Sequence, residues 1–394
     1  PLSGRAFVYQ AMRLSGAGNP LEKPADTIPN KLSQSKISKE AALGYSSYGN
    51  QIGLSTSHVT EIFHEGYKAK RFECGFVIGA VKKENVMEED PAPGDIVLLI
   101  GGDTGKDGIG GASGSSMKQD GQTTDSMLAE VQKGNAVTER KIQRLFRKQS
   151  VSTMIKKCND FGAGGICVAV GEIADSVSVD LNTVPLKYNG LNGNEIALSE
   201  SQERMAVVVE AKNATAFIEA AAAENLKATA IATVTEDDTL RMHWNGKEII
   251  NLKRSFLATN GAGKSAQAIA ENNFLAVETA DAFSKTTFLQ LLGDKNIASQ
   301  KGMVEHFDST VLGNTCLMPF GGKYQLSPGD VSAHFICDEN YSTNTVSMAS
   351  WGFDADFSSA NPFLGGMYAV IESVSKIVAA GGRFKDCYLT FQEY

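Results

Sequence analysis

Asp95-Ile96-Val97-Leu98-Leu99-Ile100 places five apolar residues in a row after one acid, and Gly101-Gly102-Asp103-Thr104-Gly105-Lys106-Asp107-Gly108-Ile109-Gly110-Gly111 follows without a break. A short apolar run that ends at a glycine turn predicts a buried β-strand. Residues 101–116 contain seven glycines, and glycine lets several backbone N–H groups converge on one anion. The pattern predicts a strand that ends at a phosphate- or nucleotide-binding loop.

Two other interpretations of this glycine-rich loop are weaker. A flexible linker is not expected directly after a buried strand, nor with the interleaved acids Asp103 and Asp107. A dinucleotide-binding fingerprint that uses Gly108 and Gly110 requires a third glycine at position 113, where Ser113 stands. The phosphate- or nucleotide-related interpretation therefore remains the favoured one.

The residues around the loop alternate between strand and helix patterns. We expect an exposed connection at 30–40, strands at 75–81, 205–210, 228–234 and 331–337, helices at 136–157, 213–223 and 366–380, and a mainly helical connection at 256–308. Asn245-Gly246 predicts the turn of a hairpin between 240–244 and 247–252. Together these elements predict an α/β sandwich with a mixed sheet.

A second glycine cluster, Asp160-Phe161-Gly162-Ala163-Gly164-Gly165, precedes an apolar segment at 166–174 that we expect to be helical. Two roles are open for Asp160. Its carboxylate could hold Mg²⁺ against a bound phosphate, because hard cations take carboxylate oxygens. It could equally cap the helix that follows.

Composition excludes several classes of function. The 394 residues contain 37 basic and 45 acidic side chains, a net charge of −8, and such a chain is a poor general binder of nucleic acid. No apolar run approaches the ~18 residues that span a bilayer. The six cysteines form no CxxC pair and the five histidines have no zinc-ligand spacing, so we expect reduced thiols and a cytoplasmic protein.

Several segments together resemble phosphoribosylformylglycinamidine synthase, also called formylglycinamide ribonucleotide amidotransferase, of the large type. The most specific are Thr104-Gly105-Lys106-Asp107-Gly108-Ile109-Gly110-Gly111 and Ser199-Glu200-Ser201-Gln202-Glu203-Arg204-Met205; on composition alone, the second would read as a solvated loop. The other resembling segments are 1–13, 44–53, 160–165, 321–326 and 389–393. Other ATP-using synthetases of the same fold carry looser versions of these motifs.

The resemblance implies an α/β (α+β) fold of the aminoimidazole ribonucleotide synthetase type. One complete C-terminal α/β sandwich would be flanked by parts of the N-terminal α/β domains of two fused repeats. The implied ranges are 1–93 for the first N-terminal domain, 94–255 for the sandwich, 256–310 for a helical connection and 311–394 for the start of the second N-terminal domain. The chain is then expected to be a fragment that is inactive alone.

The implied chemistry is the ATP-dependent conversion of formylglycinamide ribonucleotide and glutamine to the amidine, glutamate, ADP and phosphate. ATP and Mg²⁺ would be the cofactors, and a glutaminase domain of the parent chain would supply ammonia. By resemblance, Gln132, Glu200, Ser201 and Gln202 match substrate-binding positions, and Asp160 matches a metal ligand. From its glycines, the loop at Gly105, Asp107, Gly108, Gly110 and Gly111 is expected to receive phosphate.

The resemblance also implies an auxiliary nucleotide site in the second repeat. Gly329 matches a nucleotide position there, and Asp330 and Glu372 match metal ligands. Lys376 stands where the family often has a metal-binding asparagine, so this site is expected to be altered or empty. Two alternatives stay open: another ATP-using synthetase or kinase of the same fold, and a non-catalytic nucleotide-binding module.

Overall fold

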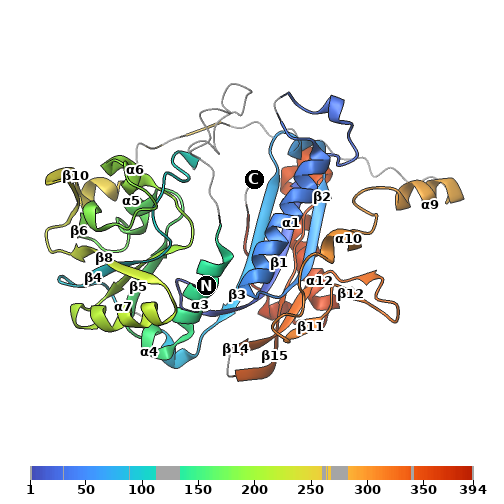
Figure 1. Ribbon diagram of the computed structural model, residues 1–394. Coiled ribbons are helices and arrows are strands. Elements are labelled where there is room, and N and C mark those ends of the chain that lie inside the picture. The colour runs from blue at the N-terminus through green and yellow to red at the C-terminus, as the bar shows by residue number, and fades with distance from the viewer. Residues whose placement is uncertain are drawn as a thin grey trace. The chain divides into compact units, whose positions relative to one another are not determined.

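The computed structural model describes residues 2–29, 31–87, 89–111, 134–259, 263, 265–267, 283–338 and 341–392. The chain divides into two compact units (Figure 1). Unit 1 comprises Pro1–Phe7 and Gly79–Lys264, and unit 2 comprises Val8–Ile78 and Ser265–Tyr394. Each unit is therefore assembled from two separate stretches of sequence.

Unit 1 is built on a seven-stranded mixed sheet with the order β10-β9-β6-β8-β4-β7-β5. Its strands are β4 (Ile96–Gly101), β5 (Ile155–Asp160), β6 (Val177–Asp180), β7 (Arg204–Val209), β8 (Lys227–Val234), β9 (Thr239–Trp244) and β10 (Lys247–Lys253). The predicted strand after Asp95 is β4, and it lies inside the sheet between β8 and β7, antiparallel to both. The expected mixed sheet and hairpin are confirmed.

Helices cover both faces of this sheet (Figure 1). They are α3 (Ala136–Arg147), α4 (Gln149–Ser152), α5 (Gly165–Ala169), α6 (Gly193–Leu198), α7 (Ala214–Ala223) and α8 (Arg254–Leu257). Val97 and Leu99 of β4 belong to one apolar core with residues of α5 and α6, whereas Leu98 and Ile100 belong to a second core with residues of α3 and α7. Because successive strand side chains point to opposite faces, a strand buried on both faces has an unbroken apolar sequence.

Unit 2 contains two three-stranded sheets. One has the order β2-β1-β3, from β1 (Phe7–Ala17), β2 (Thr56–Phe63) and β3 (Phe72–Ala80); the other has the order β11-β14-β15, from β11 (Thr315–Leu317), β14 (Ser332–Asp338) and β15 (Tyr341–Ala349). A small pair joins β12 (Phe320–Gly321) to β13 (Ser327–Pro328). The helices are α1 (Gln34–Ile52), α9 (Lys285–Leu292), α10 (Lys301–Val304), α11 (Ala355–Ala360) and α12 (Pro362–Ala379).

Single 3₁₀ turns complete the two units, at Pro24–Asp26, Glu65–Tyr67, Lys83–Asn85, Leu181–Thr183, Ala211–Asn213 and Phe384–Asp386. Among the described residues, no helix combines the length and the apolar character that crossing a bilayer requires.

Buried polar bonds connect the two stretches of sequence that form unit 2. Gln10 Nε2 of β1 donates to the carbonyl oxygen of Ser332 at 2.9 Å, and Ser57 Oγ of β2 lies 2.7 Å from His334 Nε2. These residues are fully or almost fully buried, so each bond satisfies polar groups that burial would otherwise penalise. The expected domain ranges 1–93 and 311–394 thus contain residues that pack together, while the domain boundaries themselves stay predictions.

Three expected elements differ from the structure. The helix expected over 136–157 ends at Arg147, because Lys148 adopts an extended backbone (φ −71°, ψ 117°), and β5 then begins at Ile155. The helix expected over 166–174 ends at Ala169. Part of the connection expected at 30–40 is helical: Ser33 Oγ accepts from the Lys36 N–H and α1 begins at Gln34. For the first two, the apolar spacing was compatible with more than one backbone path. The connection at 30–40 was expected because that segment is polar and rich in lysine, and an exposed helix can be so as well.

Burial of His334 makes the stability of unit 2 dependent on pH. Burial lowers the pKa of His334 from 6.5 to about 4, so between these values the unfolded chain binds a proton that the folded chain does not. The free energy of unfolding therefore has its full value above about pH 6.5 and decreases as the pH falls from 6.5 toward 4. At pH 5 the loss is about 2 kcal/mol.

The measurement is urea unfolding at pH 7 and pH 5, followed by Trp351 fluorescence in a Trp244→Phe background, since the two tryptophans lie one in each unit. His334→Gln should show about 2 kcal/mol less destabilisation at pH 5 than the unsubstituted histidine. His306→Gln, at an exposed position, is the matched control and should retain the full pH effect. An identical pH effect in all three proteins would contradict the prediction.

Candidate functional site

Three sequence segments converge on the buried side chain of Arg204 in unit 1. Arg204 lies at the start of β7 and is 1% exposed. Its Nη1 donates to Thr104 Oγ1 at 2.7 Å, and its Nε and Nη2 donate to the carbonyl oxygens of Ser201 at 2.7 Å and Ser199 at 2.6 Å. Its guanidinium also lies over the Phe161 ring, 4.4 Å from the centroid. We call the residues 104–108, 160–165 and 199–204 the unit 1 site.

The charge of Arg204 is retained inside the protein. Burial lowers its pKa to about 10, and the negative charge of Asp107 acts in the opposite direction. At neutral pH the guanidinium therefore stays protonated, and its donors are satisfied by a hydroxyl and two carbonyl oxygens. A buried charge of this kind holds its acceptors in place, because releasing them would leave it unsolvated.

Asp107 connects the glycine-rich loop to the segment that begins at Ser199. Its Oδ2 accepts from Lys187 Nζ at 2.6 Å and from Ser201 Oγ, and its carbonyl oxygen accepts from the Glu200 N–H at 2.8 Å. Ser201 Oγ in turn accepts from the Gly105 N–H at 2.9 Å. Burial alone would raise the pKa of Asp107, but the bonds from Lys187 and Ser201 outweigh it and hold the pKa below its usual value.

Asp160 supports a turn and does not cap α5. Its exposed side chain accepts from the Gly162 N–H at 3.0 Å through Oδ1, whereas the residue that precedes α5 is Gly164, with φ 84°. Glu200 Oε1 accepts from the Gly164 N–H at 3.0 Å, which joins this turn to the segment at 199–204. The helix-capping role considered for Asp160 is therefore not observed.

Close approach of two backbone segments explains the glycine at position 165. A Cβ atom there would lie 2.3 Å from the Ser199 carbonyl oxygen, and the backbone has φ 55°. Such a conformation is costly for residues with a side chain. The second glycine cluster therefore allows the turn at 160–165 to lie directly against Ser199.

Other acids lie near Asp160. Burial raises the pKa of Glu139; a bond from Gln143 opposes this, and the charges of Glu203 and Asp160 raise it further. Within the ranges that the structure describes, no group of three or more His, Cys, Asp or Glu side chains could hold a metal ion. A magnesium ion at Asp160 would therefore need further oxygen ligands, such as those of a bound phosphate, since hard cations take carboxylate and phosphate oxygens.

The structure also describes the other glycines of the loop that were expected to receive phosphate. Gly108 and Gly110 have φ values of 69° and 86°, which favour glycine, and the Gly111 N–H donates to the Gly108 carbonyl oxygen at 2.8 Å. Gln132 lies outside the described residues. The structure therefore brings together Gly105, Asp107, Glu200 and Ser201, with Gln202 Nε2 donating to the Glu200 carbonyl oxygen at 3.1 Å.

Sequence reasoning did not identify Lys187 and Tyr188, which lie against the loop. The Lys187 N–H donates to the Thr104 carbonyl oxygen at 2.9 Å, and the Thr104 N–H donates to the Pro185 carbonyl oxygen at 2.8 Å. Tyr188 accepts from the Lys106 N–H at 2.7 Å through its hydroxyl oxygen. These residues are about 80 positions from the loop and belong to no motif, so no local signal indicated them.

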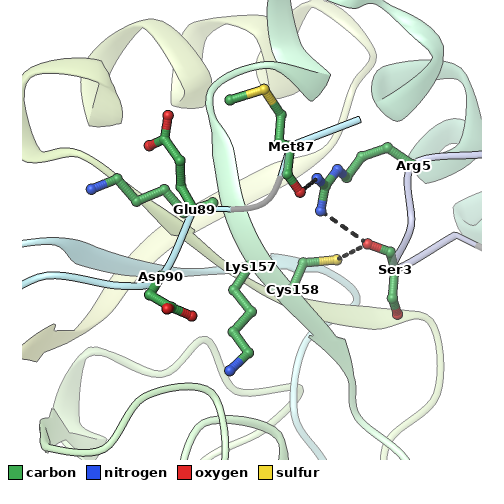
Figure 2. A pocket seen from close by; sticks show the side chains of 8 residues that line it. Ser3, Arg5, Met87, Glu89, Asp90, Lys157 and Cys158 are labelled. Carbon is green, nitrogen blue, oxygen red and sulfur yellow. Dashed lines mark hydrogen bonds between the residues drawn. The ribbon is translucent and has the colours of Figure 1, made fainter. Parts of the chain in front are cut away.

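A shallow pocket of about 310 Å³ lies elsewhere in unit 1 (Figure 2), and its lining includes Arg5, Met87, Asp90, Lys157 and Cys158. Arg5 Nη2 donates to the Met87 carbonyl oxygen at 3.0 Å, and Cys158 Sγ lies 3.7 Å from the Ser3 carbonyl oxygen. Burial raises the pKa of Cys158 to about 12, so this thiol is not a nucleophile at neutral pH. The pocket shares no residue with the unit 1 site.

The four residues expected at an auxiliary site lie in unit 2. The Gly329 carbonyl oxygen is 3.0 Å from His58 Nδ1, and Asp330 is exposed. Glu372 and Lys376 lie one turn apart on α12, with Lys376 Nζ 2.7 Å from Glu372 Oε1. The Phe353 N–H donates to Glu372 Oε2 at 3.0 Å. Both carboxylate oxygens of Glu372 thus have a donor within the protein, so its donor set does not fit a bound Mg²⁺.

The part of the chain that contains the unit 1 site is similar to a known domain family. Residues 92–245 match the sequence family described as AIR synthase related protein, C-terminal domain. This range contains every residue of the unit 1 site. The expected sandwich of the aminoimidazole ribonucleotide synthetase type is confirmed.

The similarity extends beyond that domain. Over 87% of its length the chain is 28% identical to the phosphoribosylformylglycinamidine synthase subunit PurL of Streptomyces coelicolor, covering 47% of that protein. It matches T. maritima PurL complexed with FGAR with a TM-score of 0.70 and 21% identity, over 96% of this chain and 56% of that one. It matches T. maritima PurL complexed with ATP with a TM-score of 0.69 and 20% identity, over 96% of this chain and 54% of that one. The chain spans about half the length of the curated relatives it matches.

Proposed function

We propose, from the premise that this chain is related to the PurL-type phosphoribosylformylglycinamidine synthases, that it forms part of an enzyme of purine biosynthesis. The reaction is the ATP-dependent amidation of formylglycinamide ribonucleotide, with glutamine as the source of ammonia. One observation carries the proposal: the glycine-rich loop and the segment from Glu200 to Gln202 are bound to each other through Asp107 and Ser201, above the buried Arg204. Two motifs that resemble the same enzyme thus form one site.

The residues expected to bind substrate and phosphate have distinct roles in the proposed reaction. Glu200, Ser201 and Gln202, with Gln132, bind the substrate. The backbone N–H groups from Asp107 to Gly110 receive phosphate oxygens, as glycine-rich loops do. Those of Gly105, Lys106 and Gly111 already donate within the protein. Lys187 neutralises Asp107, which otherwise would repel an incoming phosphate.

Asp160 is the proposed magnesium ligand of the unit 1 site. Bound Mg²⁺ would place positive charge where the phosphates of ATP meet the substrate oxygen. Asp160 is held for this role by its bond from Gly162, and Glu139 and Glu203 add negative charge nearby.

We further propose a cytoplasmic enzyme whose ammonia comes from a glutaminase domain or subunit. Gly329, Asp330 and Glu372 of unit 2 take no step in this reaction.

The test is turnover by the product of the complete open reading frame that encodes this chain. Asp160→Asn should lower kcat by about 10³, measured as phosphate release that depends on ATP and on formylglycinamide ribonucleotide. The amide oxygen can still accept from Gly162, so the turn should survive. Residues 1–394 alone should show no turnover.

Asp180→Asn is the matched control, because Asp180 Oδ1 accepts from the Asn182 N–H in the same kind of turn, also at 3.0 Å. This variant should keep its activity. Turnover of Asp160→Asn within threefold of the unsubstituted protein would assign Asp160 to the turn alone. Absence of substrate-dependent phosphate release from the unsubstituted protein would contradict the proposed function itself.

A further inference from the structure

Three groups that can stabilise a positive charge lie against the ammonium of Lys376 in α12. Its Nζ lies 2.7 Å from Glu372 Oε1, donates to the Trp351 carbonyl oxygen at 3.0 Å, and lies 4.1 Å from the centroid of the Trp351 ring. Only 17% of the side chain is exposed. A carboxylate, a carbonyl oxygen and the face of an indole ring are the three kinds of group that stabilise an ammonium ion.

The groups around this ammonium are also engaged with one another. Glu372 Oε2 accepts from the Phe353 N–H at 3.0 Å. His58 Nε2 accepts from Trp351 Nε1 at 2.9 Å, so His58 Nδ1 carries the proton and donates to the Gly329 carbonyl oxygen at 3.0 Å. An imidazole nitrogen binds a metal ion through its lone pair, and here one nitrogen is protonated while the lone pair of the other is occupied.

A divalent ion at Glu372 would meet an obstacle that Lys376 creates. The ion would have to displace an ammonium already at hydrogen-bonding distance or bind beside it against its charge. Glu372 and Lys376 together carry no net charge with which to attract it.

We propose that the Lys376 ammonium is the resident cation of this cluster, and that Glu372 binds no divalent metal ion in this chain. The ammonium joins Glu372 of α12 to the carbonyl oxygen and the ring of Trp351. Unit 2 then differs from the unit 1 site in needing no exchangeable cation. This proposal does not depend on the reaction proposed for unit 1.

Mn²⁺ quenching of Trp351 fluorescence tests the proposal, because the Trp351 ring lies beside the Lys376 ammonium. In a Trp244→Phe chain, Trp351 is the remaining tryptophan. Titration with MnCl₂ should give no saturable quenching. Lys376→Asn in this background should give saturable quenching, and Glu372→Gln added to Lys376→Asn should abolish it again.

Lys301→Asn is the matched control, since Lys301 also pairs with a glutamate four residues on, Glu305, and lies near an aromatic ring in unit 2. It should leave the quenching unchanged. Saturable quenching of the Trp244→Phe chain that Glu372→Gln removes would overturn the proposal. A folded Lys376→Asn variant that gains no quenching would overturn it as well; circular dichroism establishes folding, and Lys376→Gln replaces Lys376→Asn if the latter does not fold.

Discussion

Arg204→Met is expected to destabilise unit 1 by about 3–5 kcal/mol. Methionine can fill much of the space but donates no hydrogen bond, so it leaves the Ser199 and Ser201 carbonyl oxygens and the Thr104 hydroxyl without the donors they have now. A buried acceptor that loses its donor costs about 1–3 kcal/mol. Because Arg204 connects all three segments of the site, the loss should also separate them from one another.

Urea unfolding followed by Trp244 fluorescence in a Trp351→Phe background measures this effect. The midpoint should fall by about 1–5 M, given the usual slope of about 1–3 kcal/mol per molar urea. Arg241→Met is the matched control: Arg241 is in the same sheet, but its ion pairs with Asp237 and Glu248 are partly exposed, and its loss should cost less than about 1 kcal/mol. Equal shifts in the two variants would show that Arg204 is not a structural centre of unit 1.

Arg13→Met should have an effect of similar size on unit 2, again about 3–5 kcal/mol. The Arg13 side chain is fully buried and binds Glu73 through two parallel bonds, Nε to Oε1 at 2.6 Å and Nη2 to Oε2 at 2.9 Å. Its guanidinium also lies over the rings of Tyr45 and Phe307. Removing it leaves the carboxylate of Glu73 without these two donors and opens space between β1 and β3.

Trp351 fluorescence in the Trp244→Phe background reports this second unfolding transition. Arg383→Met provides the control in unit 2, because the Arg383–Asp386 pair is exposed and exposed pairs contribute little to stability. The double variant Arg13→Met/Glu73→Leu should recover part of the lost stability, since it removes a carboxylate that would keep only its bond from Arg71. A single variant Arg13→Met as stable as Arg383→Met would contradict the structural role proposed for Arg13.

The main elements of unit 1 were predictable because their signals are local. The apolar run of β4 is unbroken because both faces of that strand are buried, and Asn245-Gly246 turns the hairpin because both residues have positive φ values, 49° and 73°. The prediction of a helix over 136–157 was wrong in its second half. Ile155 and Cys158 are spaced by three residues, a spacing that fits a helix, yet they lie in β5, where a register shift at Ile155/Lys157 disturbs the alternation.

The sequence by itself determined the strand that leads to the glycine-rich loop, the positions of the glycines and the motif from Ser199 to Met205. Only the tertiary structure decided which side chains meet: Lys187 on Asp107, Arg204 beneath both motifs, and Lys376 against Glu372 and Trp351. The physical reason is the range of the interactions. Backbone conformation and burial pattern are set by neighbours a few residues apart, whereas a buried charge is satisfied by whichever acceptors the packed sheets bring to it from distant parts of the chain.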